Sequence, residues 1–253
     1  MRRRVIDKGQ EIPTIVARMW GQEPKTSHGP RPSLTLDRIT EAAIGIADAE
    51  GLAGVRMSSV AARLGVSPMA LYGYVGSKEE LLTAMVDAAT PPPPEPGGQH
   101  WRDYLAAWSR AYRDFLLGSP WLLEVSPLAP PTGPRALDWL DRLLVALSGV
   151  GLKPGEGVNI ATALSAYAVS SAALAHSLRG GADETDMAAP GDYGAILARL
   201  VDPARFPGLS AALGAGAFGG GQEWVEDADF TFGLGLLLDG IEALITLRAK
   251  EEQ

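Results

Sequence analysis

The sequence predicts an all-α protein in which a small helix-turn-helix domain precedes a larger helical domain. Every long segment repeats its apolar residues at helical spacing, and none shows a convincing period of two. Residues 91–98 hold five prolines and two glycines, a composition that cannot be helical. The charge balance also changes there, from +1 over residues 1–90 (11 Lys and Arg against 10 Asp and Glu) to −9 over residues 91–253 (11 against 20).

These breaks divide the chain into four parts. We expect a basic, flexible arm over residues 1–33, a helix-turn-helix domain over 34–90, a linker over 91–100 and a helical domain over 101–253. Residues 1–31 carry seven basic and three acidic side chains, which is typical of arms that contact nucleic acid or a membrane surface. A solvated tail explains the same composition equally well. The net charge of −8 is therefore no argument against a DNA partner, because it adds the charge of a nearly neutral N-terminal part to that of an acidic C-terminal part.

Several classes of protein are excluded or disfavoured by composition. The chain has no cysteine, which excludes disulfides, zinc–thiolate sites, iron–sulfur clusters and cysteine nucleophiles. The residues predict no metal or cofactor. Asp7, Lys8 and Glu11 interrupt the apolar core that a signal peptide needs. Residues 157–178 contain no charged side chain, but their many small residues favour a buried helix over a membrane span. The expected location is the cytoplasm, with no membrane partner.

Four short helical patterns fill residues 36–90. The first ends at Gly51, and its face is lined by Ile39, Ala42, Ala43, Ile46 and Ala49. The second, Ser58–Leu64, stops at Gly65, where a residue without Cβ adopts the left-handed conformation. Ser67 and Pro68 open the third helix with a cap hydroxyl and a proline at its first position. Ser77–Glu80 is a capping box at the start of the fourth.

The second and third helices, with a glycine in their short turn, have the arrangement of a helix-turn-helix. A hairpin of two core helices is the plainer alternative, but the conjunction of spacing, caps and small residues favours the DNA-binding motif. The second helix of such a motif enters the major groove of DNA. The residues expected to face DNA are Ser58 and Ser59 at the start of one helix and Ser67, Pro68, Met69, Ala70, Tyr72 and Gly73 at the start of the next.

Leu36–Ala89 resembles the TetR family of bacterial transcriptional regulators. The resemblance is carried by Ile39–Ala43, Asp48–Gly51, Val60–Ser67 and Leu71–Leu82, and the ending Phe230–Ile245 is similar to the last helix of the tetracycline-repressor-like branch. The resemblance implies an all-α homodimer with an N-terminal DNA-binding domain and a C-terminal effector pocket that usually controls repression. By the same resemblance, Tyr72 would contact the DNA backbone or a thymine methyl group, and Lys78 would bind phosphate.

The DNA-binding region departs from the common pattern of that family. Its third helix carries Met69 and Ala70 and has no Arg, Asn or Gln, so bidentate base contacts are missing there. We therefore expect specificity to come partly from apolar contact with thymine methyls and from DNA shape. The leader before Leu34 is also long, and we expect its arginines, Arg31 among them, to lie in a minor groove.

Aromatic residues concentrate at the start of the second domain. Trp101, Tyr104, Trp108, Tyr112 and Phe115 lie three or four residues apart and so share a helix face. This stripe is either a core or the wall of a pocket for a small apolar or aromatic effector. On the uncharged helix, the expected polar contacts of such an effector are Asn159, Tyr167, Ser170 and His176. For His176 alone, an ordinary core position is the more common role.

Two helices of the second domain are candidates for a dimer interface. On the uncharged helix, Ala161, Ser165, Ala168 and Ala172 permit close helix approach, and a second stripe consists of Phe230, Leu234, Leu237, Ile241 and Leu244. A twofold dimer would read two half-sites of DNA at once. The resemblance implies that such helices form a four-helix interface between two copies.

The predicted function is a ligand-responsive repressor that a small effector releases from double-stranded operator DNA. A regulator of the same fold without an effector, acting as an activator or a constitutive repressor, is the second interpretation. Gly214–Gly219 matches a dinucleotide fingerprint, but neither the strand before it nor the helix start after it is predicted. The three histidines, His28, His100 and His176, are accompanied by no nucleophile-elbow sequence, so an enzyme is a distant alternative.

Overall fold

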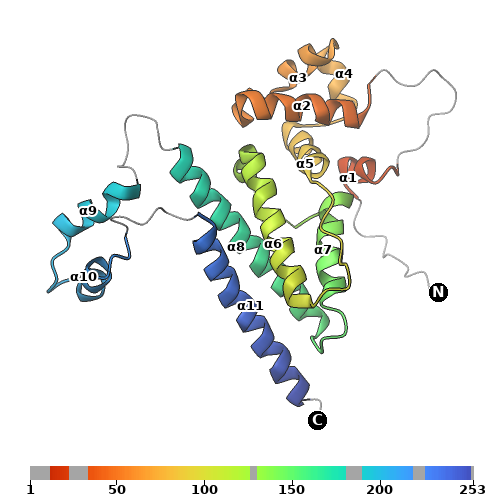
Figure 1. Ribbon diagram of the computed structural model, residues 1–253. Helices are drawn as coiled ribbons and strands as arrows, with labels where there is room; N and C mark the ends of the chain where they lie inside the picture. Colours follow the sequence, from red (N-terminus) through yellow and green to blue (C-terminus); the bar gives the residue numbers. More distant parts are fainter. Residues whose placement is uncertain (1–11, 23–33, 126–129, 181–189, 219–225, 252–253) are drawn as a thin grey trace.

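The computed structural model describes residues 12–22, 34–125, 130–180, 190–218 and 226–251, and within these ranges all regular structure is helical (Figure 1). A short helix, α1 (Thr14–Met19), precedes the small domain. The helices of the small domain are α2 (Leu36–Glu50), the single turn η1 (Leu52–Gly54), α3 (Met57–Leu64), α4 (Pro68–Tyr72) and α5 (Lys78–Ala89). The helices of the larger domain are α6 (Trp101–Gly118), η2 (Pro120–Glu124), α7 (Pro134–Ala146), α8 (Pro154–Gly180), α9 (Pro190–Leu200), α10 (Pro207–Gly214) and α11 (Glu226–Glu251).

Local capping explains why the small domain folds where the sequence predicts. The Ser67 hydroxyl accepts from the Ala70 N–H at 3.3 Å, and the Ser77 hydroxyl accepts from the Glu80 N–H at 3.2 Å. The Glu80 carboxylate accepts from the N–H of Gly76 at 2.7 Å, one residue earlier than in a regular capping box. Gly65 ends α3 in the left-handed conformation, with φ of 70°.

The small domain is fastened to the larger one by a shared core. Buried residues of α2–α5, such as Ile39 and Leu81, belong to the same cluster as Leu116 of α6 and Trp121 of η2. The indole N–H of Trp121 also donates to Asp48 Oδ1 at 2.8 Å. Because α5 takes part in this core, its position is linked to that of the helices beneath it.

Residues 12–22 differ from the expected flexible arm. They form α1, which packs on α5, and Ile15 is buried there while Val16 and Met19 are partly buried. Arg18 donates to the carbonyl of Tyr74 in the small domain, and the Trp20 indole donates to the Thr132 carbonyl at 2.9 Å, ahead of α7. Three apolar side chains and two hydrogen bonds hold this segment on the protein, although the basic composition around it predicts a solvated tail.

The larger domain is a bundle of α6, α7, α8 and α11, while α9 and α10 lie to one side of it in Figure 1. The proline-rich linker follows the bundle closely: the Pro91 carbonyl accepts from the Trp139 indole at 2.7 Å, and the Pro94 carbonyl accepts from the Tyr104 hydroxyl at 2.9 Å. The predicted linker is therefore anchored to the bundle by its own carbonyls.

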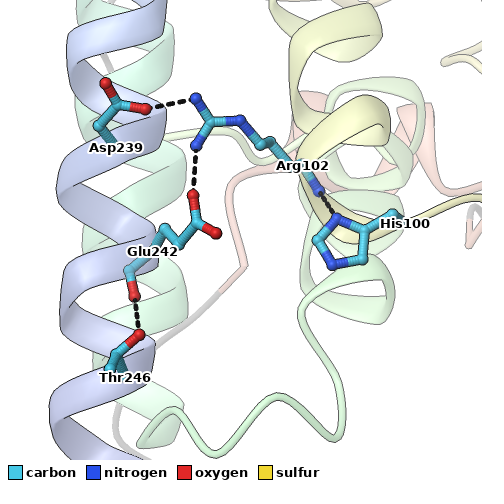
Figure 2. A network of polar contacts seen from close by, with 5 residues as sticks. All are labelled: His100, Arg102, Asp239, Glu242 and Thr246. Atoms are coloured by element: carbon cyan, nitrogen blue, oxygen red, sulfur yellow. Dashed lines mark hydrogen bonds and ion pairs between the residues drawn. The ribbon is translucent and has the colours of Figure 1, made fainter.

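Two helices, residues 154–177 in α8 and 228–251 in α11, are long and apolar enough to cross a membrane by length and composition alone. In this protein they pack on each other and on α6. Ion pairs also join α11 to its neighbours. Arg102 of α6 pairs with Asp239 and Glu242 of α11 (Figure 2), and Arg248 pairs with Glu156 of α8.

Candidate nucleic-acid interface and ligand cavity

The α3–α4 pair presents the first three residues of α4 and the Ser67 cap to solvent. Val60, Ala61 and Leu71 are buried where the two helices cross, and the Val66 N–H donates to the Ala61 carbonyl at 3.0 Å across the turn. This packing fixes the orientation of α4. Met69 is consequently 78 % exposed and Tyr72 is 49 % exposed. The geometry suits insertion of an uncharged helix into the major groove.

Most of the predicted DNA-binding residues are exposed on α3, on α4 and beside them. Ser58, Ser67, Pro68, Ala70 and Gly73 are exposed, and Ser59 and Lys78 are half-buried. Arg31 lies outside the described residues. Sequence reasoning did not select Arg56, which is exposed and immediately precedes the first residue of α3. An exposed arginine at a helix start, close to Ser58, is suited to a phosphate contact.

A cavity of about 870 Å³ opens between α5, α6, α7 and α8. Its wall contains four aromatic side chains, from Trp108, Tyr112, Phe115 and Trp139. The Trp108 and Trp139 rings meet edge to face with centroids 5.4 Å apart, and Tyr112 lies 5.5 Å from Trp139. Burial raises the pKa of the Tyr112 hydroxyl. An apolar cavity of this size, with few polar groups, is typical of small-molecule sites.

Asp87 of α5 is a polar group in the cavity wall and is 7 % exposed. Its Oδ1 accepts from the backbone N–H groups of Arg135 and Ala136, at 3.0 and 3.1 Å, and so caps the start of α7. Burial raises the pKa of Asp87, although the two N–H groups act in the opposite direction. This contact links α5, the helix that follows the DNA-binding motif, directly to the cavity wall on α7.

The predicted effector residues separate into three groups. Trp108 and Tyr112 line the cavity. Trp101 and Tyr104 are buried in the adjacent core, and the Tyr167 hydroxyl donates to the Phe230 carbonyl at 3.0 Å. The exposed residues, away from the cavity, are Asn159, Ser170 and His176. Sequence reasoning missed Trp139 and Asp87, because no helical periodicity shows that α5 and α7 meet at this point.

The structure also separates the predicted dimer residues. Ala161, Ala168 and Ala172 of α8 are buried within the chain, and Ala161 lines the cavity. On α11, Leu234 and Ile241 are buried, and Leu237 and Leu244 are half-buried. Among the described side chains of α8 and α11, the large apolar ones that are exposed are Val158, Leu174, Phe232, Leu236 and Leu247.

A helix-turn-helix domain attached to a helical bundle with an aromatic cavity defines a class of one-component DNA-binding regulators. Comparison with known proteins agrees: residues 39–85 match the family model described as "Bacterial regulatory proteins, tetR family", and residues 93–245 match "Tetracyclin repressor-like, C-terminal domain". The chain belongs to the TetR family. It is a DNA-binding transcriptional regulator.

Individual relatives are similar over most of the chain. The HTH-type transcriptional repressor DrrR1 of Streptomyces coeruleorubidus is 35 % identical over 248 residues, which are 95 % of this chain and 89 % of the relative. The ActR protein of Streptomyces coelicolor in complex with actinorhodin superposes with a TM-score of 0.68 at 26 % identity, over 86 % of this chain and 99 % of that chain. The structure of BioQ with its double-stranded DNA operator superposes with a TM-score of 0.50 at 27 % identity, over 55 % of this chain and 86 % of that chain.

Proposed function

We propose that two copies of this repressor bind an operator through their α4 helices, in the cytoplasm, and release it when a small aromatic molecule enters the α5–α8 cavity. The observation that carries this proposal is that one helix, α5, contributes to both parts. It begins six residues after Tyr72, and it places Leu82, Val86 and Asp87 in the cavity wall. The DNA-bound BioQ structure and the ligand-bound ActR structure support the two halves of the mechanism.

The coupling follows from rigid contacts on both sides of the cavity. Asp87 joins α5 to the start of α7, and α1 joins the small domain to Thr132 through Arg18 and Trp20. A molecule that separates α5 from α7 would therefore turn the small domain relative to the bundle. In a dimer this changes the spacing of the two α4 helices, which favours the state that no longer fits both half-sites. A differential affinity of a few kcal/mol would change operator occupancy strongly.

The proposed dimer uses the outward faces of α8 and α11. Phe232 is 72 % exposed and Leu236 is 60 % exposed on α11. Leu174 of α8 and Leu247 of α11 are also exposed apolar side chains. Gly240 is also exposed, and the space beside its Cα is open, so a neighbouring helix can approach closely there. Helices that leave large apolar side chains in water gain free energy by pairing with a second copy.

The decisive experiment blocks the cavity without touching the DNA-binding surface. Operator fragments are first selected from genomic DNA with the full chain, and aromatic compounds are screened for release by fluorescence anisotropy. Thr162 of α8 lines the cavity, and a tryptophan there would occupy part of its volume. We expect Thr162→Trp to bind the operator normally and to stay bound when the aromatic compound is added. His176→Trp, on the same helix but outside the cavity, is the matched control and should respond like the parent. Equal release of both variants would contradict the proposed location.

A further inference from the structure

The charged residues in the cavity wall all have the same sign. Among the described residues that line it, Glu79, Asp87 and Glu124 are acidic, and no lysine, arginine or histidine is present. Apart from these carboxylates the wall consists of apolar side chains, four aromatic rings and a few neutral polar groups. A cavity of this composition has a negative potential, which the low polarity of its surroundings strengthens.

The three carboxylates occupy different depths. Asp87 is 7 % exposed, whereas Glu79 and Glu124 are exposed. Only Oδ1 of Asp87 is occupied, by the two N–H groups of α7. Its Oδ2 accepts no hydrogen bond from the described part of the chain, and it is not among the buried polar atoms shut away from solvent there. Asp87 is one of the residues that line the cavity, and Oδ2 is its unused acceptor.

The charge of Arg135 favours the ionised form of Asp87, but burial outweighs it, and the two side chains form no ion pair. The Arg135 guanidinium donates to the Ala88 carbonyl at 2.6 Å and is not part of the cavity wall. The partial positive charge at the start of α7 acts on Oδ1 of Asp87, which accepts from the two N–H groups there. Burial still raises the pKa of Asp87 in spite of these contacts, so the protein's own groups stabilise its charge incompletely.

We propose that the effector is an aromatic cation, with its positive group paired to Asp87 and its ring system against Trp108, Tyr112 and Trp139. This inference rests on the cavity being the effector site, as proposed above, and adds the charge of the ligand. A cation gains both an ion pair in a sheltered site and attraction to the faces of the aromatic rings. An anion meets three carboxylates, and a neutral ligand without a donor leaves Asp87 Oδ2 desolvated and unpaired. Glu79 and Glu124 attract the cation to the entrance.

Three compounds with one ring system separate charge from shape. The probes are 9-aminoacridine, a cation, acridine, which is neutral at mildly alkaline pH, and acridine-9-carboxylate, an anion. Binding to the full chain is measured by isothermal titration calorimetry, together with quenching of tryptophan fluorescence. We expect the cation to bind about tenfold or more tightly than acridine, since hydrogen bonds to charged groups are the stronger ones. The anion should bind more weakly than acridine.

Asp87→Asn tests the residue itself, because an amide keeps an acceptor for the start of α7 but loses the charge. We expect about a tenfold loss of affinity for 9-aminoacridine, with acridine binding changed less than about twofold. Asp141→Asn makes the same chemical change on an exposed position of α7 outside the cavity and should change neither affinity. A double variant, Glu79→Gln with Glu124→Gln, changes only exposed residues and serves as the test if Asp87→Asn folds poorly. It should slow the association of the cation and reduce the salt dependence of that association rate.

The outcomes distinguish this inference from the proposed function. Equal affinity for the three probes, or tighter binding of the neutral or anionic compound, would overturn the cationic ligand and leave the cavity as a site. Selective cation binding that persists in the Asp87→Asn chain and in the Glu79→Gln, Glu124→Gln chain would overturn the assignment of the charge to these residues. Failure of all three probes to bind would overturn the cavity as an aromatic site, and the charge inference with it.

Discussion

The contact between α5 and α7 depends on a glycine, and a single methyl group should break it. Gly133 precedes α7 with φ of −83° and ψ of 155°, a conformation that alanine adopts without strain. A Cβ on this residue would nevertheless fall well inside contact distance of the Asp87 carboxylate, and 2.7 Å from the Asp87 Cβ. Gly133→Ala must therefore push the carboxylate away from the N–H groups of Arg135 and Ala136.

The expected cost follows from the bonds that are lost. A hydrogen bond to a charged group contributes about 1.5–3 kcal/mol, and water replaces part of the two that Asp87 gives up. We expect Gly133→Ala to lower the free energy of unfolding by about 2–3 kcal/mol, and the melting temperature by about 4–10 °C. Thermal unfolding followed by circular dichroism measures this at one fixed protein concentration, because dimerisation makes the transition concentration-dependent.

A double-mutant cycle shows whether Asp87 is the cause. In an Asp87→Ala background only the Cβ contact at 2.7 Å remains, so the cost of Gly133→Ala should fall to below about 1 kcal/mol. Gly155→Ala is the control, since nothing lies within 4 Å of a Cβ there, and it should leave stability unchanged or slightly higher. Additive effects of Gly133→Ala and Asp87→Ala would refute the explanation.

Three further predictions concern the DNA surface, the dimer and an ion pair. Met69→Glu should reduce operator affinity at least about 100-fold in anisotropy titrations, because it places a negative charge against DNA, while an unchanged melting temperature confirms the exposed position of Met69. Leu236→Asp should give monomers in light scattering, whereas Ile241→Asp, at 8 % exposure, should destabilise the fold; a dimeric Leu236→Asp chain would exclude this face. The Arg248 guanidinium lowers the pKa of Glu156, so the ion pair stabilises the fold above the usual carboxyl pKa and is lost as pH falls through the lowered pKa. Glu156→Gln should therefore lower the melting temperature near pH 7 and have a progressively smaller effect as the pH falls below the usual carboxyl pKa, and a pH-independent effect would contradict the ion pair.

Local chemistry allowed the small domain to be predicted from sequence. The caps at Ser67 and Ser77 and the left-handed Gly65 act within a few residues of themselves, so they specify helix boundaries without tertiary information. The aromatic spacing on α6 likewise predicted a single inward face. It did not show where along that face the core ends and the cavity begins, which separates Trp101 and Tyr104 from Trp108 and Tyr112.

The last helix shows most clearly what sequence alone leaves open. Between Phe230 and Leu247, α11 carries apolar residues outside the predicted stripe, such as Leu236 and Leu238, so the sequence does not show which side faces the bundle and which faces a second copy. Packing on α6 and α8 buries Leu234 and Ile241 and leaves Leu236 in solvent. The sequence by itself determined the helices and the nature of the small domain. Only the tertiary structure decided which residues meet across helices, since Asp87 and the start of α7 lie 48 residues apart in the chain and become neighbours through packing.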